Sequence, residues 1–230
     1  MKRVIYLLVF STMLPAIVKA QAFNFDIGFA LGTPNGSFQQ SLDRNSYGLD
    51  IGATYQIGNS PFHIGGGLVY QNFGWSERSE YFSPDIPEVE LRVRTTNNMV
   101  TPHLLVRIEP NLGVISPFVE GMYGFNYLYT ESSVLDDWDE EEIASSVNYD
   151  SYTSSVGIGG GVKFKLYEGY DEDGDFIGVS LILKTKYMLG GEANYLKEGG
   201  LVRTRRGIDY DVSRSRTDLT TFNVGFVLNF

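Results

Sequence analysis

The chain contains no cysteine. A disulfide framework is therefore excluded, and the fold has to draw its stability from buried surface and a complete backbone hydrogen-bond network. Beyond the N-terminus, no apolar run reaches the roughly 18–20 residues of a membrane-spanning helix, which excludes a helical membrane protein. Basic residues are scarce, because 18 Lys and Arg stand against 28 Asp and Glu, for a formal charge of −10. This balance argues against nucleic acid as a partner.

Glycine and aromatic residues, in contrast, are abundant. The 230 residues include 26 Gly, 15 Tyr and 15 Phe. Aromatic side chains suit the pleated surface of a strand, and glycine permits bends and close backbone approach. The composition therefore favours an all-β fold.

The first 20 residues are typical of a cleavable secretory signal peptide. Lys2 and Arg3 give a positive start, and residues 4–18 form a short apolar region that small residues follow. We expect cleavage after Ala20, with cleavage after Ala22 as the alternative. An uncleaved membrane anchor is disfavoured because the apolar region is short. The mature β-barrel domain would then be residues 21–230.

From Phe23 onward the sequence alternates with period two, which predicts strands with one apolar and one polar face. Segments of about 9–12 residues match the length of a tilted strand that crosses a bilayer. Pro102 removes one backbone donor, so we expect a bulge or local irregularity there. The eight predicted strand segments are residues 23–31, 47–57, 62–71, 100–108, 119–129, 155–166, 179–189 and 221–230.

Three features distinguish a membrane barrel from a soluble sandwich or soluble barrel. The non-apolar face carries too many charges for a dry soluble core. Tyr and Phe gather at segment ends, where an interfacial aromatic girdle would lie. The links alternate short and long, as expected for periplasmic turns and external loops when both termini are periplasmic. The short links are residues 58–61, 109–117 and 167–176, and the long ones are residues 32–46, 76–98, 130–152 and 190–218.

These features predict an all-β fold, an eight-stranded antiparallel up-and-down transmembrane β-barrel. Eight strands leave an interior just wide enough for side chains to fill it. We therefore expect the inward charges to pair in a plug, because buried charges need partners. A gated ion path is the alternative. The predicted interior charges are Asp26, Asp50, Arg107, Glu120, Lys163, Lys165, Lys184 and Lys186.

The last segment, Phe-Asn-Val-Gly-Phe-Val-Leu-Asn-Phe over residues 222–230, and the glycine- and aromatic-rich residues 117–125 and 157–164 carry a resemblance. Over residues 23–230 the chain resembles the small outer-membrane β-barrel family that includes the OmpA transmembrane domain and OmpX. The resemblance implies location in the outer membrane. It also implies that the C-terminal segment is the signal read by the barrel-assembly machinery. The residues of that signal would be Phe222, Val224, Phe226, Leu228 and Phe230.

Some eight-stranded barrels act on lipid A, so a catalytic role has to be considered. Only His63 and His103 could serve as a base near neutral pH. Neither lies in a His-x-Ser pattern like that of lipid A deacylases, and both are predicted to point inward. Residues 171–175, Asp-Glu-Asp-Gly-Asp, are similar to the front of a calcium loop but lack its other ligands, which favours a polar turn. We expect no catalytic site, cofactor or metal.

The third and fourth long links carry opposite charges. An acidic run surrounds Trp138 in the third, and arginines gather in the fourth. These links either pair with each other or present a surface suited to lipopolysaccharide phosphates or an acidic partner. The residues proposed for such recognition are Trp138, Arg203, Arg205, Arg206, Arg214 and Arg216.

Three classes of function remain. A non-enzymatic barrel that serves envelope structure or surface contacts through its external loops is preferred. An accessory subunit of a larger outer-membrane complex is second, since the small outward residues Ala53, Gly66, Gly121 and Gly160 would permit close approach of another protein or lipid. A narrow channel or a lipid A-modifying enzyme is third. The expected partners are outer-membrane lipids and lipopolysaccharide, the barrel-assembly machinery and other outer-membrane proteins.

Overall fold

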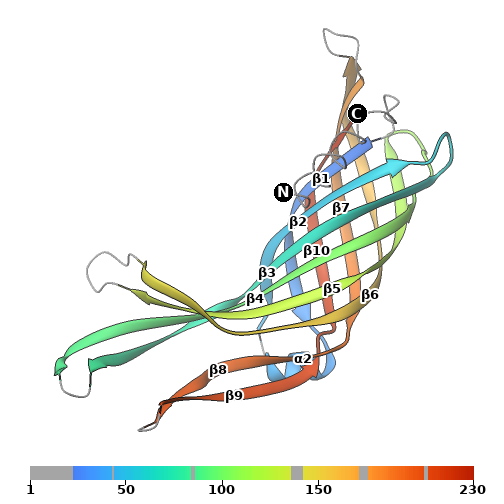
Figure 1. Ribbon diagram of the computed structural model, residues 1–230. Coiled ribbons are helices and arrows are strands. Elements are labelled where there is room, and N and C mark those ends of the chain that lie inside the picture. Colours follow the sequence, from blue (N-terminus) through green and yellow to red (C-terminus); the bar gives the residue numbers. More distant parts are fainter. Residues whose placement is uncertain (1–22, 43, 84–85, 136–141, 171–175, 205–206) are drawn as a thin grey trace, which may run out of the picture.

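Eight antiparallel strands close into one barrel in the computed structural model (Figure 1). They are β1 (Phe23–Pro34), β2 (Ser46–Gln56), β3 (Phe62–Ser83), β4 (Ile86–Ile108), β5 (Ile115–Leu135), β6 (Glu142–Tyr170), β7 (Phe176–Gly190) and β10 (Leu219–Asn229). Around the wall the order is β1-β10-β7-β6-β5-β4-β3-β2. The predicted fold class is confirmed. The structure describes residues 23–42, 44–83, 86–135, 142–170, 176–204 and 207–230.

The wall closes where β10 meets β1. Their register runs from Asn24 opposite Asn229 to Pro34 opposite Leu219. Beyond it, the backbone N–H of Phe230 donates to the carbonyl of Phe23 at 2.8 Å, and the reverse bond measures 3.2 Å. Both described ends of the chain therefore lie at the same end of the barrel (Figure 1).

The side chains alternate across the wall as the sequence predicts. In β10, for example, Phe222 and Phe226 are exposed on the outside, whereas Asn223 and Val227 are buried inside. Each of the eight predicted segments coincides with part of a barrel strand, apart from residues 57 and 230 at the ends of two of them, and its apolar face points outward. The barrel thus has an apolar exterior and a polar interior, the inverse of a soluble protein.

Pro102 lies in the middle of β4. The pairing of β4 with β5 skips Pro102 and the residue before it, yet Val100 opposite Tyr127 and His103 opposite Gly124 belong to the same register. The expected irregularity is therefore a gap in the pairing and not a bulge. Proline removes one donor without inserting an extra residue.

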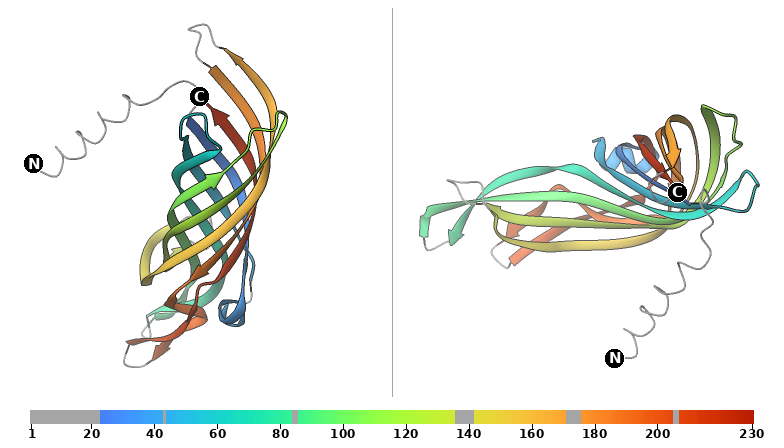
Figure 2. Two further views of the ribbon diagram at one scale, coloured as in Figure 1. Left: turned by 90° about the vertical axis from the view of Figure 1, so that its right-hand side faces the viewer. Right: turned by 90° about the horizontal axis from the view of Figure 1, so that it is seen from above.

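The prediction that residues 76–98 and 130–152 are loops is wrong. Strands β3, β4, β5 and β6 continue beyond the barrel as long paired strands (Figures 1 and 2). The β2–β3 pairing ends at Tyr47 opposite Asn72, whereas β3 and β4 stay paired as far as Ser83 opposite Ile86. Most of residues 76–98 and 130–152 is therefore strand. Outside a bilayer neither face of a strand has to be apolar. The backbone hydrogen bonds between these strands therefore continue in segments whose sequence no longer alternates between apolar and polar residues.

The other two long links also contain regular structure. Residues 190–218 form a hairpin of β8 (Glu192–Thr204) and β9 (Gly207–Arg216), and residues 32–46 include the short helix α2 (Gly36–Ser41). Both elements lie at the end of the barrel opposite the termini (Figure 1). Among the described residues, no helix is long and apolar enough to span a membrane.

An apolar cap closes this end of the barrel around Phe38 of α2. Phe38 is fully buried, and its ring meets those of Phe73 and Tyr195 edge to face, with centroids 5.5 and 5.6 Å apart. A single short helical turn is held here by burial, since nothing in its own sequence caps it. The cap consists of Phe38, Leu42, Phe73, Met99, Leu128, Ala193, Tyr195 and Leu219.

Glycines that face the barrel interior have no side chain, and large interior side chains occupy the space beside them. A Cβ atom on Gly52 would lie 2.7 Å from a carboxylate oxygen of Asp26, and one on Gly67 would lie 2.9 Å from the ring of His103. At Gly161 a Cβ would meet the backbone of β7 itself. The high glycine content is thus explained by crowding inside a narrow barrel.

Candidate functional site

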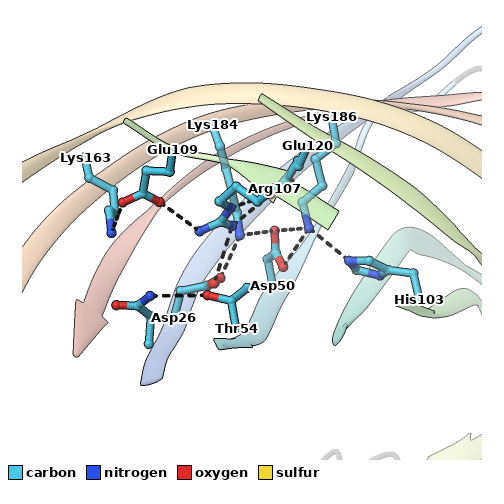
Figure 3. A network of polar contacts seen from close by, with 11 residues as sticks. Asp26, Asp50, Thr54, His103, Arg107, Glu109, Glu120, Lys163, Lys184 and Lys186 are labelled. Atoms are coloured by element: carbon cyan, nitrogen blue, oxygen red, sulfur yellow. Dashed lines mark hydrogen bonds and ion pairs between the residues drawn. The ribbon is translucent and has the colours of Figure 1, made fainter. Parts of the chain in front are cut away.

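The inward faces of six strands bring eight charged side chains together in the middle of the barrel (Figure 3). We call this group the interior cluster. Four of its members are acids and four are bases, so it carries no net charge, and every member is buried. The interior cluster consists of Asp26, Asp50, Arg107, Glu109, Glu120, Lys163, Lys184 and Lys186.

Arg107 joins the two halves of the cluster. Its Nε and Nη2 atoms donate to the same oxygen of Glu120 at 2.9 and 2.8 Å. Longer ion pairs reach Asp26 at 3.9 Å and Glu109 at 3.7 Å. The guanidinium also lies over the ring of Phe118, 4.4 Å from its centroid. Arg107 is only 1% exposed, so these carboxylates and the aromatic ring stand in for water around it, although its Nη1 atom makes no hydrogen bond with the described residues.

Two lysines of β7 complete the cluster on the side of the cap. The ammonium of Lys184 lies 2.7 Å from Asp26 and 3.1 Å from Asp50. The ammonium of Lys186 lies 2.9 Å from Asp50 and 3.5 Å from Nε2 of His103. Because β7 presents both lysines at alternate positions, they point to the same side of the wall and share one carboxylate.

Seven of the eight predicted interior charges belong to the cluster, and Lys165 does not. Lys165 pairs instead with Glu168 at 2.7 Å near the end of β6, where both side chains are partly exposed. Glu109, which forms an ion pair with Lys163, was not among the predicted interior charges. Glu109 follows Arg107 by two residues, so extending the alternation of β4 by one step past its last strand residue would have placed it inside.

Between the cluster and the cap the interior is tightly filled. The enclosed void beside His103 and Lys186 measures about 10 Å³, roughly the space of a single water molecule. Next to it, the hydroxyl of Thr101 donates to Asn126 at 2.9 Å, and the amide of Asn126 donates to Thr217 at 2.8 Å. This arrangement can hold the wall rigidly in shape, and it leaves no room for a hydrated ion.

Both histidines are buried inside the barrel. His103 contacts the backbone carbonyl of Thr101 through Nδ1, and His63 lies near the opposite end, by the β2–β3 turn. Neither side chain faces the apolar exterior, where a lipid substrate would lie. Within the described part of the chain, no group of three or more histidine, aspartate or glutamate side chains is placed to hold a metal ion.

Only part of the proposed recognition surface can be placed. Arg214 pairs with Glu192 at 2.6 Å and Arg216 with Asp218 at 3.3 Å, so each finds its partner in or next to its own hairpin. The remaining predicted residues, and the runs at 136–141 and 171–175, lie outside the residues whose side chains the structure describes. Those predicted residues are Trp138, Arg203, Arg205 and Arg206.

The apolar side chains of the proposed assembly signal line the outer face of the last strand. Each of them is more than one third exposed, and none points into the barrel. Their partners across the wall include Ile27 and Leu181, which flank Phe226 on the two neighbouring strands. The residues are Phe222, Val224, Phe226, Leu228 and Phe230.

No protein-family model and no curated protein matches this sequence. Among solved structures, the chain is similar to Ail, the attachment invasion locus protein of Yersinia pestis, in a complex with the heparin analogue sucrose octasulfate. The identity is 13%, the match covers 92% of this chain and 100% of Ail, and the TM-score is 0.44. It is also similar to Neisserial surface protein A, with 12% identity, 92% and 99% coverage and a TM-score of 0.47.

A third similar structure is a major outer membrane protein from Thermus thermophilus. Its identity is 13%, its coverage is 91% of this chain and 100% of that chain, and its TM-score is 0.39. The assignment of the fold itself rests on the strand order and registers of this chain.

Proposed function

We propose that the protein is an outer-membrane β-barrel with a side-chain-filled interior, which serves envelope structure or surface contacts through the parts that project beyond the membrane. Both termini face the periplasm, and the barrel-assembly machinery inserts the chain through its C-terminal segment. Lipid and lipopolysaccharide surround the wall. The protein is not an enzyme and takes no cofactor.

The observation that carries this proposal is the apolar exterior of a closed barrel. Leu104, Tyr123 and Ile158 are 71%, 66% and 70% exposed, and they belong to a set of large exposed apolar side chains on every barrel strand. Soluble monomers rarely expose contiguous apolar patches larger than a few hundred Å². A lipid environment removes that cost, and the closed hydrogen-bond ladder satisfies the backbone inside it.

The interior supports a structural role over conduction. The cluster balances four acids with four bases, so no charge is left to attract a permeating ion. The cap lies across one end, and the void beneath it has about the volume of one water molecule. A path through the barrel would require both the cluster and the cap to open.

The projecting strands support a role at the cell surface. With the termini in the periplasm, the extended β3–β4 and β5–β6 hairpins and the β8–β9 hairpin all lie on the external side (Figure 1). Connections beyond the membrane carry specificity in proteins of this kind. Our predicted contacts for lipopolysaccharide phosphates or an acidic partner remain Trp138, Arg203, Arg205, Arg206, Arg214 and Arg216.

The membrane location can be tested by removing detergent from the purified mature chain. We expect the protein to aggregate in plain buffer and to stay folded in detergent or lipid vesicles, because its wall is apolar. A protein that remained folded and monomeric in plain buffer would contradict the proposal.

The orientation can be tested with single cysteines, because the chain has none of its own. Ser146 lies on β6 beyond the barrel, and Asn59 lies in the β2–β3 turn at the other end. A membrane-impermeant maleimide should label Ser146→Cys on intact cells and Asn59→Cys only after the outer membrane is permeabilised. The reverse pattern would place the termini outside.

One observation favours the second candidate function, an accessory subunit of a larger complex. An apolar groove of about 850 Å³ runs along the outer wall, and Gly66, Leu104 and Tyr123 are among the residues that line it. It would allow another membrane protein to approach closely. If this role applies, we expect a second protein to co-purify with the chain in a fixed ratio after gentle detergent extraction. The variant Gly66→Phe, whose side chain fills the groove, should then purify without that protein. If the unmodified chain purifies without any partner, the accessory role is contradicted and the first proposed function stands.

A further inference from the structure

A polar cavity of about 550 Å³ opens at the end of the barrel where the termini lie. We call it the cup. Asn24 and Asn229 line it from the first and last strands, and His63, Glu109 and Lys163 line its inner part. Its volume lies within the roughly 300–1,000 Å³ that is typical of small-molecule sites. The interior cluster closes the inner end, so the cup is a recess and not a passage.

The inner part of the cup contains buried polar groups that the protein itself does not satisfy. His63 is 4% exposed, and its Nδ1 atom makes no hydrogen bond with the described residues. Oε2 of Glu109, also buried, has only the 3.7 Å ion pair with Arg107. Buried polar atoms in native proteins are usually hydrogen-bonded, so these two atoms are available to a polar molecule in the cup, whether water or a ligand.

The charges of the cup cancel in pairs. Lys163 pairs with Glu109 in the inner part, and Lys165 pairs with Glu168 nearer the opening. A charged ligand would have to displace one of these partners, and the displaced charge would lose its counterion. The cup therefore favours a ligand with no net charge.

The remaining polar lining is made of amides and hydroxyls. Asn24, Gln56 and Asn229 each donate one amide hydrogen to a group of the barrel, and Asn111 accepts one from the backbone. Each of these amides has a further hydrogen and a further lone pair to offer, so it can both donate to a ligand and accept from it. Hydroxyl groups of a neutral ligand do the same, so the two sets match. We propose that the cup is a binding site for a small neutral saccharide, held by the amides and by the unpaired atoms of His63 and Glu109. This site is independent of the role proposed above for the external parts.

The site can be tested on the full mature chain in detergent. A fluorescent label on Asn59→Cys, at the edge of the cup, is unique because the chain has no cysteine. We expect a saturable change of fluorescence with sucrose or N-acetylglucosamine, and binding about tenfold weaker with glucose 6-phosphate. Absence of saturation with both neutral sugars up to about 10 mM, where even a millimolar site is filled, would overturn the proposal.

Two variants separate binding in the cup from a non-specific response. Ser116→Phe fills the cup and should weaken sugar binding at least about tenfold, whereas Ser154→Phe, on the outer wall, should bind as the unmodified chain does. An equal response of both variants would overturn the proposal. Glu168→Gln leaves Lys165 without its partner, so it should bind glucose 6-phosphate about tenfold more tightly than before, whether or not Ser116→Phe folds. An unchanged preference would contradict charge balance as the basis of selectivity.

Discussion

The ammonium of Lys184 lies 2.7 Å from the carboxylate of Asp26, although 158 positions separate the two residues in the sequence. The strands that carry them, β7 and β1, are not neighbours, because β10 lies between them in the wall. Their ion pair therefore spans the barrel interior across one strand. It links two strands that no backbone hydrogen bond joins.

We predict that Lys184→Met destabilises the barrel by about 3–5 kcal/mol, because it leaves Asp26 and Asp50 buried with fewer counterions. The matched control is Lys165→Met, which removes a partly exposed pair and should cost about 0–1 kcal/mol. Urea unfolding in lipid vesicles measures both free energies. Equal losses would show that the interior cluster does not stabilise the fold.

Phe226 lies on the outer face of β10, between Ile27 and Leu181. Phe226→Arg should lower the free energy of unfolding by about 2–4 kcal/mol if the position is near the middle of the bilayer, because a charge then faces lipid. Phe226→Leu keeps the site apolar and provides the control. A small effect of arginine, similar to that of leucine, would mean that this face is not in contact with lipid.

Inward and outward glycines should differ sharply in their tolerance to a methyl group. A Cβ on Gly161 would press on the backbone of Leu183 and Lys184, whereas one on Gly121 meets no atom within 4 Å. We expect Gly161→Ala to cost about 1–3 kcal/mol and Gly121→Ala to be nearly neutral, measured by the same unfolding assay. The opposite order would reverse the assignment of the two faces.

The barrel should not conduct ions even when its cap is weakened. Phe38→Ala removes the residue at the centre of the cap, but the interior cluster beneath stays in place. In planar bilayers we expect no large stable openings, either from the unmodified chain or from Phe38→Ala. Large openings of the unmodified chain would favour the gated ion path, and openings of Phe38→Ala alone would make the cap the only seal.

The membrane-crossing part of the fold could be predicted because lipid imposes a simple rule. A strand in a bilayer must present an apolar side chain at every second position, and segments such as residues 221–230 obey this without exception on their outer face. The same alternation places Asp26, Asp50, Glu120 and Arg107 inside. The pairing of each basic side chain with a particular acidic one depends on the order of the strands and on their stagger around the barrel. Neither property can be predicted from a local stretch of sequence.

Beyond the bilayer the rule no longer applies, and the prediction was correspondingly poorer. The extensions of β3 and β4 are paired by backbone hydrogen bonds that any sequence can form, and the ion pair of Glu77 with Arg94 at 2.6 Å is a side-chain contact that becomes evident only once the register is known. Phe38 gave no local signal, because it is a single aromatic residue in a polar stretch, and the partners that bury it come from strands far away in the sequence. Glu109 was missed for a smaller reason, since it lies just past the end of a strand.

The wall is completed by contact between its first and last strands, and this has a consequence for biogenesis. β1 is synthesised first and finds its second neighbour only when β10 is available. Until then the incomplete sheet has two unpaired edge strands and an exposed apolar face, both of which can associate with other unfolded chains. Such a chain depends on chaperones between the ribosome and the membrane. Loss of its last few residues would prevent the barrel from closing, because β1 would lack its second neighbour.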